Sequence, residues 1–148
     1  MELNQIGGGE IMSSDAKESK QARQQVTPYI SVKDSAAAIE FYKKAFAATE
    51  LTRIPMPDGR IGHAEIKIGD ATIMMADEYP EIQFLSPESL GGSGVVIHVY
   101  VDDVDDFASR AVEAGAKLVR PVANAPYGDR NCKIVDPFGH AWFFATPI

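Results

Sequence analysis

Two histidines and a glutamate are the residues of this chain best suited to chemistry. His63 and Glu65 alternate with apolar residues in the segment 60–68, so both side chains share one face if this segment is a strand. His98 lies in a second, β-branched run, and the three side chains form a cluster if the two faces adjoin. A histidine titrates near neutral pH and a neighbouring carboxylate stabilises its cation, which suits general acid–base catalysis. The same trio also suits a metal ion, a structural hydrogen-bonded cluster or a solvated strand edge.

The segments that must position these residues occur twice. Val95 to Val101 is rich in β-branched residues and leads directly into a helix-like pattern from Asp103. The segment 29–34 repeats this junction upstream, so that Asp34 matches Asp103, and a turn glycine follows at a similar distance in each half. Order and spacing together predict one βαβββ unit used twice.

Periodicity and turn residues give the bounds of the predicted elements. In the first half they predict strands at 26–32, 50–55, 60–68 and 71–76 and a helix at 36–47. In the second half they predict strands at 95–101, 117–122, 130–135 and 140–145 and a helix at 103–114. The expected fold is α+β, with residues 26–148 as one domain made of modules 26–77 and 94–147. The linker 78–93 has no pattern of its own, and residues 1–25 form a polar N-terminal extension with a short helix predicted from Ser14 to Gln24.

Composition excludes several classes of partner. The formal net charge of −7 disfavours nucleic acid and anionic membrane surfaces. No apolar run reaches the roughly 20 residues that cross a bilayer. The N-terminus lacks the basic and apolar regions of a signal peptide, and the single cysteine, Cys132, fits a reducing compartment. These features predict a cytoplasmic protein.

Short motifs along both halves occur in a characteristic order. They are 32–34 (VKD), 39–42 (IEFY), 69–70 (GD), 101–105 (VDDVD), 127–130 (YGDR) and 136–142 (DPFGHAW). Together they resemble the vicinal oxygen chelate superfamily, the group of glyoxalases, bleomycin-resistance proteins and extradiol dioxygenases. The run 127–130 before the Asp-Pro-Phe-Gly-His turn resembles its PhnB-like branch. The resemblance covers about residues 26 to 147.

This resemblance implies curled mixed sheets around a cleft, often in a homodimer. It also implies, for many members, a divalent metal held by one residue on the first and last strand of each module. Those four positions carry Thr27, Met75, Val96 and Phe143. None is a histidine or a carboxylate, the ligands that such ions prefer, so we expect neither a metal nor another cofactor.

Strand alternation predicts what lines the cleft, if helices cover the faces of Ile30 and Val99. The ligand-binding residues are then Thr27, Tyr29, Met75, Val96, His98, Tyr100 and Phe143. Such an apolar and aromatic wall is typical of small-molecule pockets and predicts a small, partly aromatic ligand, as in drug sequestration. His140 is predicted to be a turn or packing residue.

Two other functions remain open from the sequence. One is a lyase, isomerase or dioxygenase-type enzyme that uses His98 with His63 and Glu65. The other is an interaction module with no small ligand. The sequence also leaves open whether the cleft forms within one chain or between two.

Overall fold

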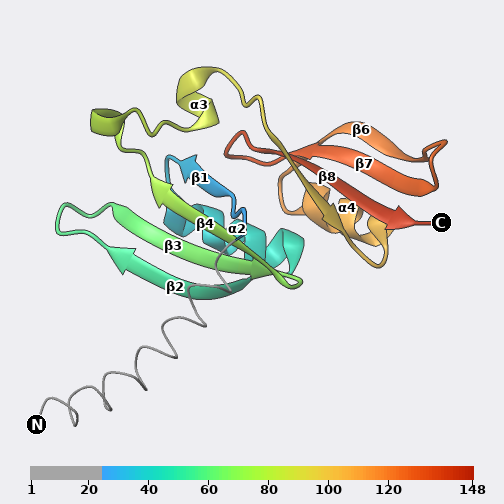
Figure 1. Ribbon diagram of the computed structural model, residues 1–148, viewed down its shortest axis with the longest axis horizontal. Helices are drawn as coiled ribbons and strands as arrows, with labels where there is room; N and C mark the ends of the chain where they lie inside the picture. The colour runs from blue at the N-terminus through green and yellow to red at the C-terminus, as the bar shows by residue number, and fades with distance from the viewer. Residues whose placement is uncertain (1–24) are drawn as a thin grey trace, which may run out of the picture.

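Two four-stranded mixed sheets make up residues 25–148, the part of the chain that the computed structural model describes (Figure 1). The first sheet has the order β1 (Tyr29–Val32), β4 (Ala71–Asp77), β3 (Ile61–Ile68), β2 (Thr49–Pro55), with helix α2 (Ser35–Phe46). The second has the order β5 (Val96–Tyr100), β8 (Ala141–Pro147), β7 (Asp129–Val135), β6 (Lys117–Asn124), with helix α4 (Val104–Glu113). The pairs β1–β4 and β5–β8 are parallel, and the other neighbours are antiparallel.

This architecture confirms the predicted α+β fold with a βαβββ order in each half. The helix predicted from Ser14 to Gln24 lies outside the described residues. β1 begins at Tyr29, later than predicted, so Thr27 precedes the strand. Pro28, which lacks a backbone N–H, stands between them.

Both long helices begin at an aspartate, as the repeat predicts. The backbone N–H of Ala37 donates to Asp34 Oδ1 at 3.0 Å, and that of Asp106 donates to Asp103 Oδ1 at 3.1 Å. Each carboxylate thus accepts a hydrogen bond from a backbone N–H that has no partner within the helix. Its negative charge also interacts favourably with the positive end of the helix dipole.

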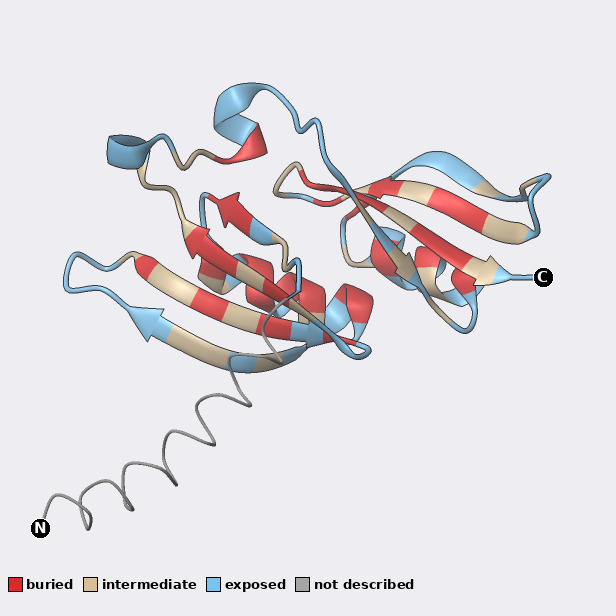
Figure 2. Ribbon diagram, in the orientation of Figure 1, coloured by how far each residue is buried: buried red, intermediate tan, exposed pale blue. Residues whose placement is uncertain are grey.

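One core joins the two modules. Helices α2 and α4 pack against each other, and Phe46 at the end of α2 meets two rings of β8. Its ring centroid lies 4.9 Å from that of Trp142 and 4.8 Å from that of Phe144. Figure 2 shows buried residues along these helices and the central strands. Each sheet therefore has one helix-covered face and one open face.

A buried carboxylate also ties the modules together. Asp136, in the turn before β8, accepts hydrogen bonds on Oδ2 from Tyr42 Oη at 2.5 Å and from Trp142 Nε1 at 2.9 Å. Its Oδ1 accepts from the backbone N–H groups of Phe138 and His140 at 2.9 and 3.0 Å. Burial and the Asp136 carboxylate hold the pKa of Tyr42 well above its usual value, so Tyr42 stays a donor.

His140 contributes a further contact between the modules. Its Nε2 lies 2.8 Å from the carbonyl oxygen of Ser31 on β1, and the side chain is buried. The prediction of a packing histidine is confirmed.

The linker holds two short helices that the sequence did not predict. These are η1 (Pro80–Ile82) and α3 (Pro87–Leu90), too short to show a periodic pattern. Glu78 holds the second one in place, since its carboxylate accepts from the Ser86 N–H at 2.8 Å. Hydrogen bonds from Ser86 and Ser89 lower the pKa of Glu78 to about 2. From residue 25 to 148, no helix is long and apolar enough to cross a membrane.

Candidate functional site

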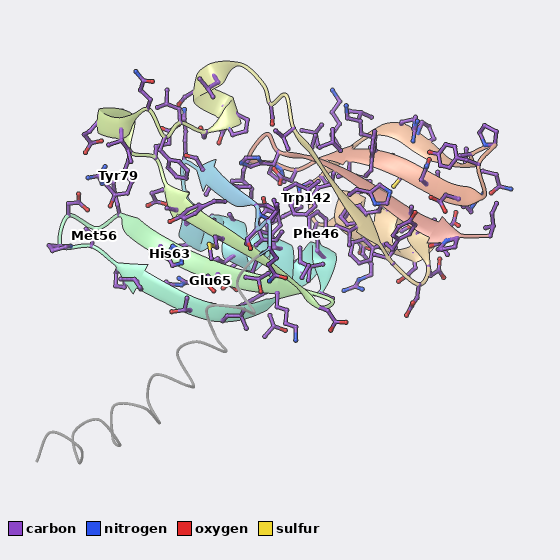
Figure 3. All side chains as sticks on the ribbon, viewed as in Figure 1. Phe46, Met56, His63, Glu65, Tyr79 and Trp142 are labelled. Atoms are coloured by element: carbon purple, nitrogen blue, oxygen red, sulfur yellow. The ribbon has the colours of Figure 1, made fainter. Side chains whose placement is uncertain are left out.

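The open face of the first sheet carries a hydrogen-bonded row of three polar side chains. Tyr29 Oη lies 2.7 Å from His63 Nδ1, and His63 Nε2 lies 2.7 Å from Glu65 Oε2. Tyr29 comes from β1 and the other two from β3, with β4 between them. We call these residues the Tyr29–His63–Glu65 row; Figure 3 shows His63 and Glu65 next to each other on β3.

Strand β4 contributes Met74 to this face, not Met75 as predicted. Met74 pairs with both Tyr29 and Glu65 in the sheet register. Met75 is 0% exposed and packs in the helix-covered core with Ala64 and Ile66. The error has a plain cause, because Ile73 to Ala76 are all apolar and alternation alone does not reveal which pair faces the helix.

Part of the linker packs beside this row. The Phe84 ring makes an edge contact with Tyr29, with 5.5 Å between the centroids. Tyr79 lies nearby and stacks under the guanidinium of Arg60, at 4.1 Å from its carbon to the ring centroid. Burial, the Glu65 carboxylate and Tyr79 raise the pKa of Tyr29, so its hydroxyl stays protonated around neutral pH.

The open face of the second sheet carries the predicted residues of β5 and β8. Val96, His98 and Tyr100 are exposed, and Phe143 pairs with His98 in the register. The His98 and Tyr100 ring centroids are 4.8 Å apart, and Tyr100 Oη donates to Asp129 at 3.0 Å. Within one chain the structure does not bring His98 to His63 and Glu65, because they belong to different sheets.

Two cations lie near the Phe143 ring, with Lys133 its partner on β7 and Arg120 the next residue across on β6, and the sequence interpretation missed both. The guanidinium carbon of Arg120 lies 5.2 Å from the ring centroid and the ammonium of Lys133 lies 5.8 Å from it. Arg120 also donates to Asn131 Oδ1 at 2.7 Å. Within the described chain neither cation forms an ion pair with a carboxylate. Side chains alternate between the two faces of the strand 129–135, and Ile134 faces the core. Alternation therefore predicts that Lys133 lies on the open face, and the sequence contained this signal.

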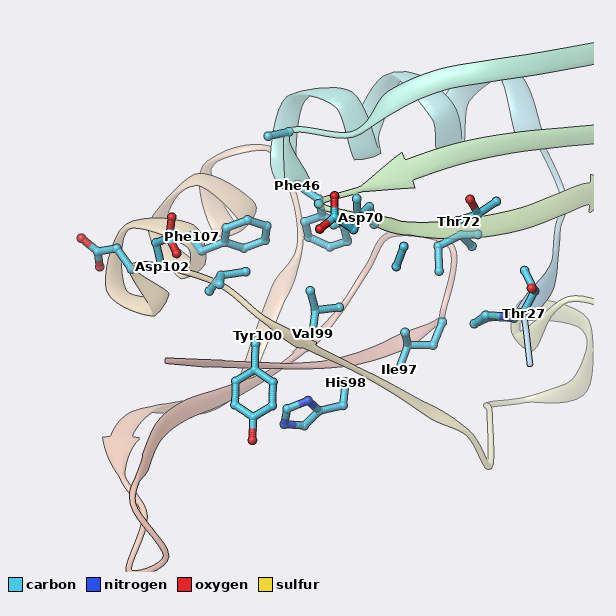
Figure 4. A pocket seen from close by; sticks show the side chains of 18 of the residues that line it. Thr27, Phe46, Asp70, Thr72, Ile97, His98, Val99, Tyr100, Asp102 and Phe107 are labelled. Atoms are coloured by element: carbon cyan, nitrogen blue, oxygen red, sulfur yellow. The ribbon is translucent and has the colours of Figure 1, made fainter. Parts of the chain in front are cut away.

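A pocket of about 970 Å³ lies at the seam between the modules. Thr27 and Phe46 line it, together with α4 residues and an acidic rim that includes Asp70. The lining also takes in Ile97, His98, Val99 and Tyr100 of β5, and Figure 4 shows the side chains of His98 and Tyr100 on the opposite side of the strand from Ile97 and Val99. The seven residues predicted to bind the ligand therefore do not line a single pocket within one chain.

These residues lie in different places. Thr27 lies at the seam pocket, Tyr29 on the first open face and Met75 in the core. Val96, His98, Tyr100 and Phe143 lie on the second open face, and His98 and Tyr100 also belong to the lining of the seam pocket.

The four positions that the resemblance implies for metal ligands give an unsuitable donor set. Val96 and Phe143 have no donor atom, and Met75 offers only a buried thioether. The Thr27 hydroxyl remains, and it is a poor ligand for a divalent ion. Between residues 25 and 148, no three His, Cys, Asp or Glu side chains group closely enough to hold a metal.

Comparison with known proteins places the chain in a family. The model of the Glyoxalase/Bleomycin resistance protein/Dioxygenase superfamily matches residues 23–144. The chain belongs to this superfamily. The resemblance predicted from the motifs is thereby confirmed.

Relatives in sequence and in structure agree with this assignment to the superfamily. The uncharacterized protein Mb0911c of Mycobacterium bovis is 43% identical over 126 residues, which cover 83% of each chain. The crystal structure of TioX from Micromonospora superposes with a TM-score of 0.66 and 25% identity, covering 84% of this chain and 97% of TioX. The PhnB protein from Bacillus cereus shares the fold with a TM-score of 0.62 at 16% identity, covering 83% and 99%.

Proposed function

We propose that this superfamily member binds a small, partly aromatic anion without a metal ion, in a cleft completed by a second copy of the chain. The open face of the first sheet of one subunit would lie opposite the open face of the second sheet of its partner. The observation that carries the proposal is the Phe143 ring with the charged groups of both Lys133 and Arg120 near it on one sheet face.

That arrangement favours an aromatic ligand with a negative charge. Phe143 pairs with His98, whose ring contacts that of Tyr100, and these side chains provide ring surface for stacking. Arg120 presents a planar guanidinium that matches a carboxylate, and Lys133 adds a second positive charge. Since neither has a carboxylate partner among the described residues, an anionic ligand satisfies both.

A homodimer explains why apolar side chains remain uncovered on both open faces. Tyr29 is 46% exposed, Val96 37% and Tyr100 60%. β1 and β5 also pair on one side only in the described chain, which leaves two strand edges free. Exposed apolar faces and free edges both favour association with another chain.

The donor chemistry of Thr27, Met75, Val96 and Phe143, which does not suit a divalent ion, supports binding without a metal. The cytoplasmic location stays a prediction. Catalysis is the second candidate function, and the Tyr29–His63–Glu65 row is the observation that favours it.

Calorimetry with two matched probes tests the binding site. We expect 3-nitrobenzoate to bind more tightly than the neutral 3-nitrobenzamide. Replacing both cations, Arg120→Gln with Lys133→Gln, should weaken nitrobenzoate binding roughly tenfold or more, since each hydrogen bond to a charged group contributes about 1.5–3 kcal/mol. His98→Ala should also weaken it. Lys44→Gln removes an exposed charge in the last turn of α2 and is the matched control.

Three results would contradict the proposal. One is equal affinity for both probes, and another is a monomer at micromolar concentration by analytical ultracentrifugation. The third is stoichiometric Zn, Ni, Mn or Fe in the purified protein by elemental analysis.

A further inference from the structure

We propose that the Tyr29–His63–Glu65 row is a proton relay that takes a proton from a hydroxyl group of the bound ligand. The inference deepens the proposed function and rests on it, because it names the second group that the ligand presents. The ligand class is then an aromatic or enolic hydroxyl compound that also carries an anionic group.

The hydrogen-bond directions along the row follow from the chemistry of its members. An ionised carboxylate only accepts hydrogen bonds, so His63 Nε2 must donate to Glu65 across the 2.7 Å contact. In a neutral imidazole the other nitrogen then accepts. Tyr29 must therefore donate its phenolic proton to His63 Nδ1, also at 2.7 Å.

This order leaves the lone pairs of Tyr29 Oη as the acceptor that the row presents to the open face. Tyr29 is 46% exposed, whereas the side chains of His63 and Glu65 are 26% and 27% exposed. A ligand therefore reaches Tyr29 more readily than the two residues behind it. The group that such an acceptor binds is a donor, O–H or N–H.

The relay step balances without any further reactant. The O–H bond of the ligand breaks while a new O–H bond forms at Tyr29 Oη. The original phenolic proton of Tyr29 passes to His63 Nδ1, and the resulting imidazolium is paired with the Glu65 carboxylate. The ligand becomes an oxyanion that accepts a hydrogen bond from Tyr29.

Two features of the site agree with a relay through a neutral tyrosine. Burial and the Glu65 carboxylate raise the pKa of Tyr29, which opposes a tyrosinate, and the relay never forms one. The rings of Tyr29 and His63 are fixed in an edge contact with 5.3 Å between centroids, and Phe84 holds Tyr29 from another side at 5.5 Å. The hydroxyl is thus positioned before a ligand binds.

Proton transfer to a positioned side chain is also the basis of general acid–base catalysis. The row involves no residue of the second sheet, so it is separate from the Arg120 and Lys133 anion site. One ligand spanning the cleft would touch both.

The probe that tests the relay is 4-hydroxy-3-nitrobenzoate, whose nitrophenolate form absorbs at longer wavelength than the phenol. Its hydroxyl-free analogue is 3-nitrobenzoate. We expect the ionisation midpoint of the bound probe to fall by roughly one pH unit relative to the free probe, because the relay stabilises the oxyanion. His63→Gln keeps a hydrogen-bond acceptor for Tyr29 but removes the proton acceptor, and Tyr29→Phe removes the link. Both should abolish the shift while 3-nitrobenzoate still binds.

Glu65→Gln should reduce the shift, because a neutral amide does not stabilise the imidazolium. Glu113→Gln, which removes the same charge at the end of α4, is the control and should leave it unchanged. In the ligand-free protein, ¹⁵N spectra of neutral His63 should show the Nε2–H tautomer.

The possible outcomes separate the two proposals. Absence of binding by both nitro compounds at millimolar concentration would refute the proposed function. Binding of both without a spectral shift, a shift that survives His63→Gln, or a neutral His63 in the Nδ1–H tautomer would refute the relay alone.

Discussion

Replacing Asp136 by asparagine should destabilise this protein more than its conservative size suggests. Four donors converge on the carboxylate, two on each oxygen, and Asp136 is only 3% exposed. An amide offers one oxygen, so its NH₂ group must face either the two backbone N–H groups or Tyr42 with Trp142. Two buried donors are then left unpaired, at about 1–3 kcal/mol each, which gives a loss of roughly 2–6 kcal/mol.

Urea unfolding followed by tryptophan fluorescence measures this loss, since Trp142 is the single tryptophan. Tyr42→Phe is the comparison, because it deletes one donor and leaves Oδ2 bonded to Trp142. It should cost only about 1.5–3 kcal/mol. In the Tyr42→Phe background the Asp136→Asn loss should shrink, because one of the opposed donors is gone. A stability of Asp136→Asn within about 0.5 kcal/mol of the unmodified protein, or an Asp136→Asn loss that does not shrink in the Tyr42→Phe background, would refute this account of the carboxylate.

Two further pairs of substitutions test the packing. Met75→Ala should cost about 2–5 kcal/mol by leaving a cavity in the core, whereas Met74→Ala on the open face should cost less than about 1 kcal/mol; equal losses in thermal or urea unfolding would contradict the assignment of faces on β4. Gly139→Ala should lower the stability more than Gly59→Ala. Both glycines have φ of +93°, so both variants share a backbone strain of about 1–2 kcal/mol. Only at position 139 does the added Cβ also meet Pro87, at 2.8 Å. Equal melting temperatures for these two variants would contradict this expectation, because they would show that α3 shifts away from the added Cβ without a loss of stability.

The fold was predictable because its local signals agree with one another. Asp34 and Asp103 cap the two helices, and glycines mark the turns at Gly69 and Gly139 in the same order in each half. Where an element is short, the signal disappears. α3 spans one helical turn, and its position depends on the Glu78 carboxylate and on Pro87 packing against Gly139, neither of which produces a periodic pattern.

The site was predictable only within each sheet. Alternation placed His63 with Glu65 on one face, and Val96 with His98 and Tyr100 on another. It does not give the relation between sheets, so His98 was grouped with His63 although they lie on different ones. The contact of Tyr29 with His63 was also missed, because it crosses β4 and depends on the register of three strands.

The way the two halves share their interior has a practical consequence. Phe46 from one half lies among Trp142 and Phe144 from the other, so the repeat seen in the sequence is not a pair of separable folding units. The polypeptide between them is exposed from Glu88 to Val96. A single protease cut there should leave two fragments that remain associated, and the same stretch offers a place to divide the gene for complementation from two polypeptides.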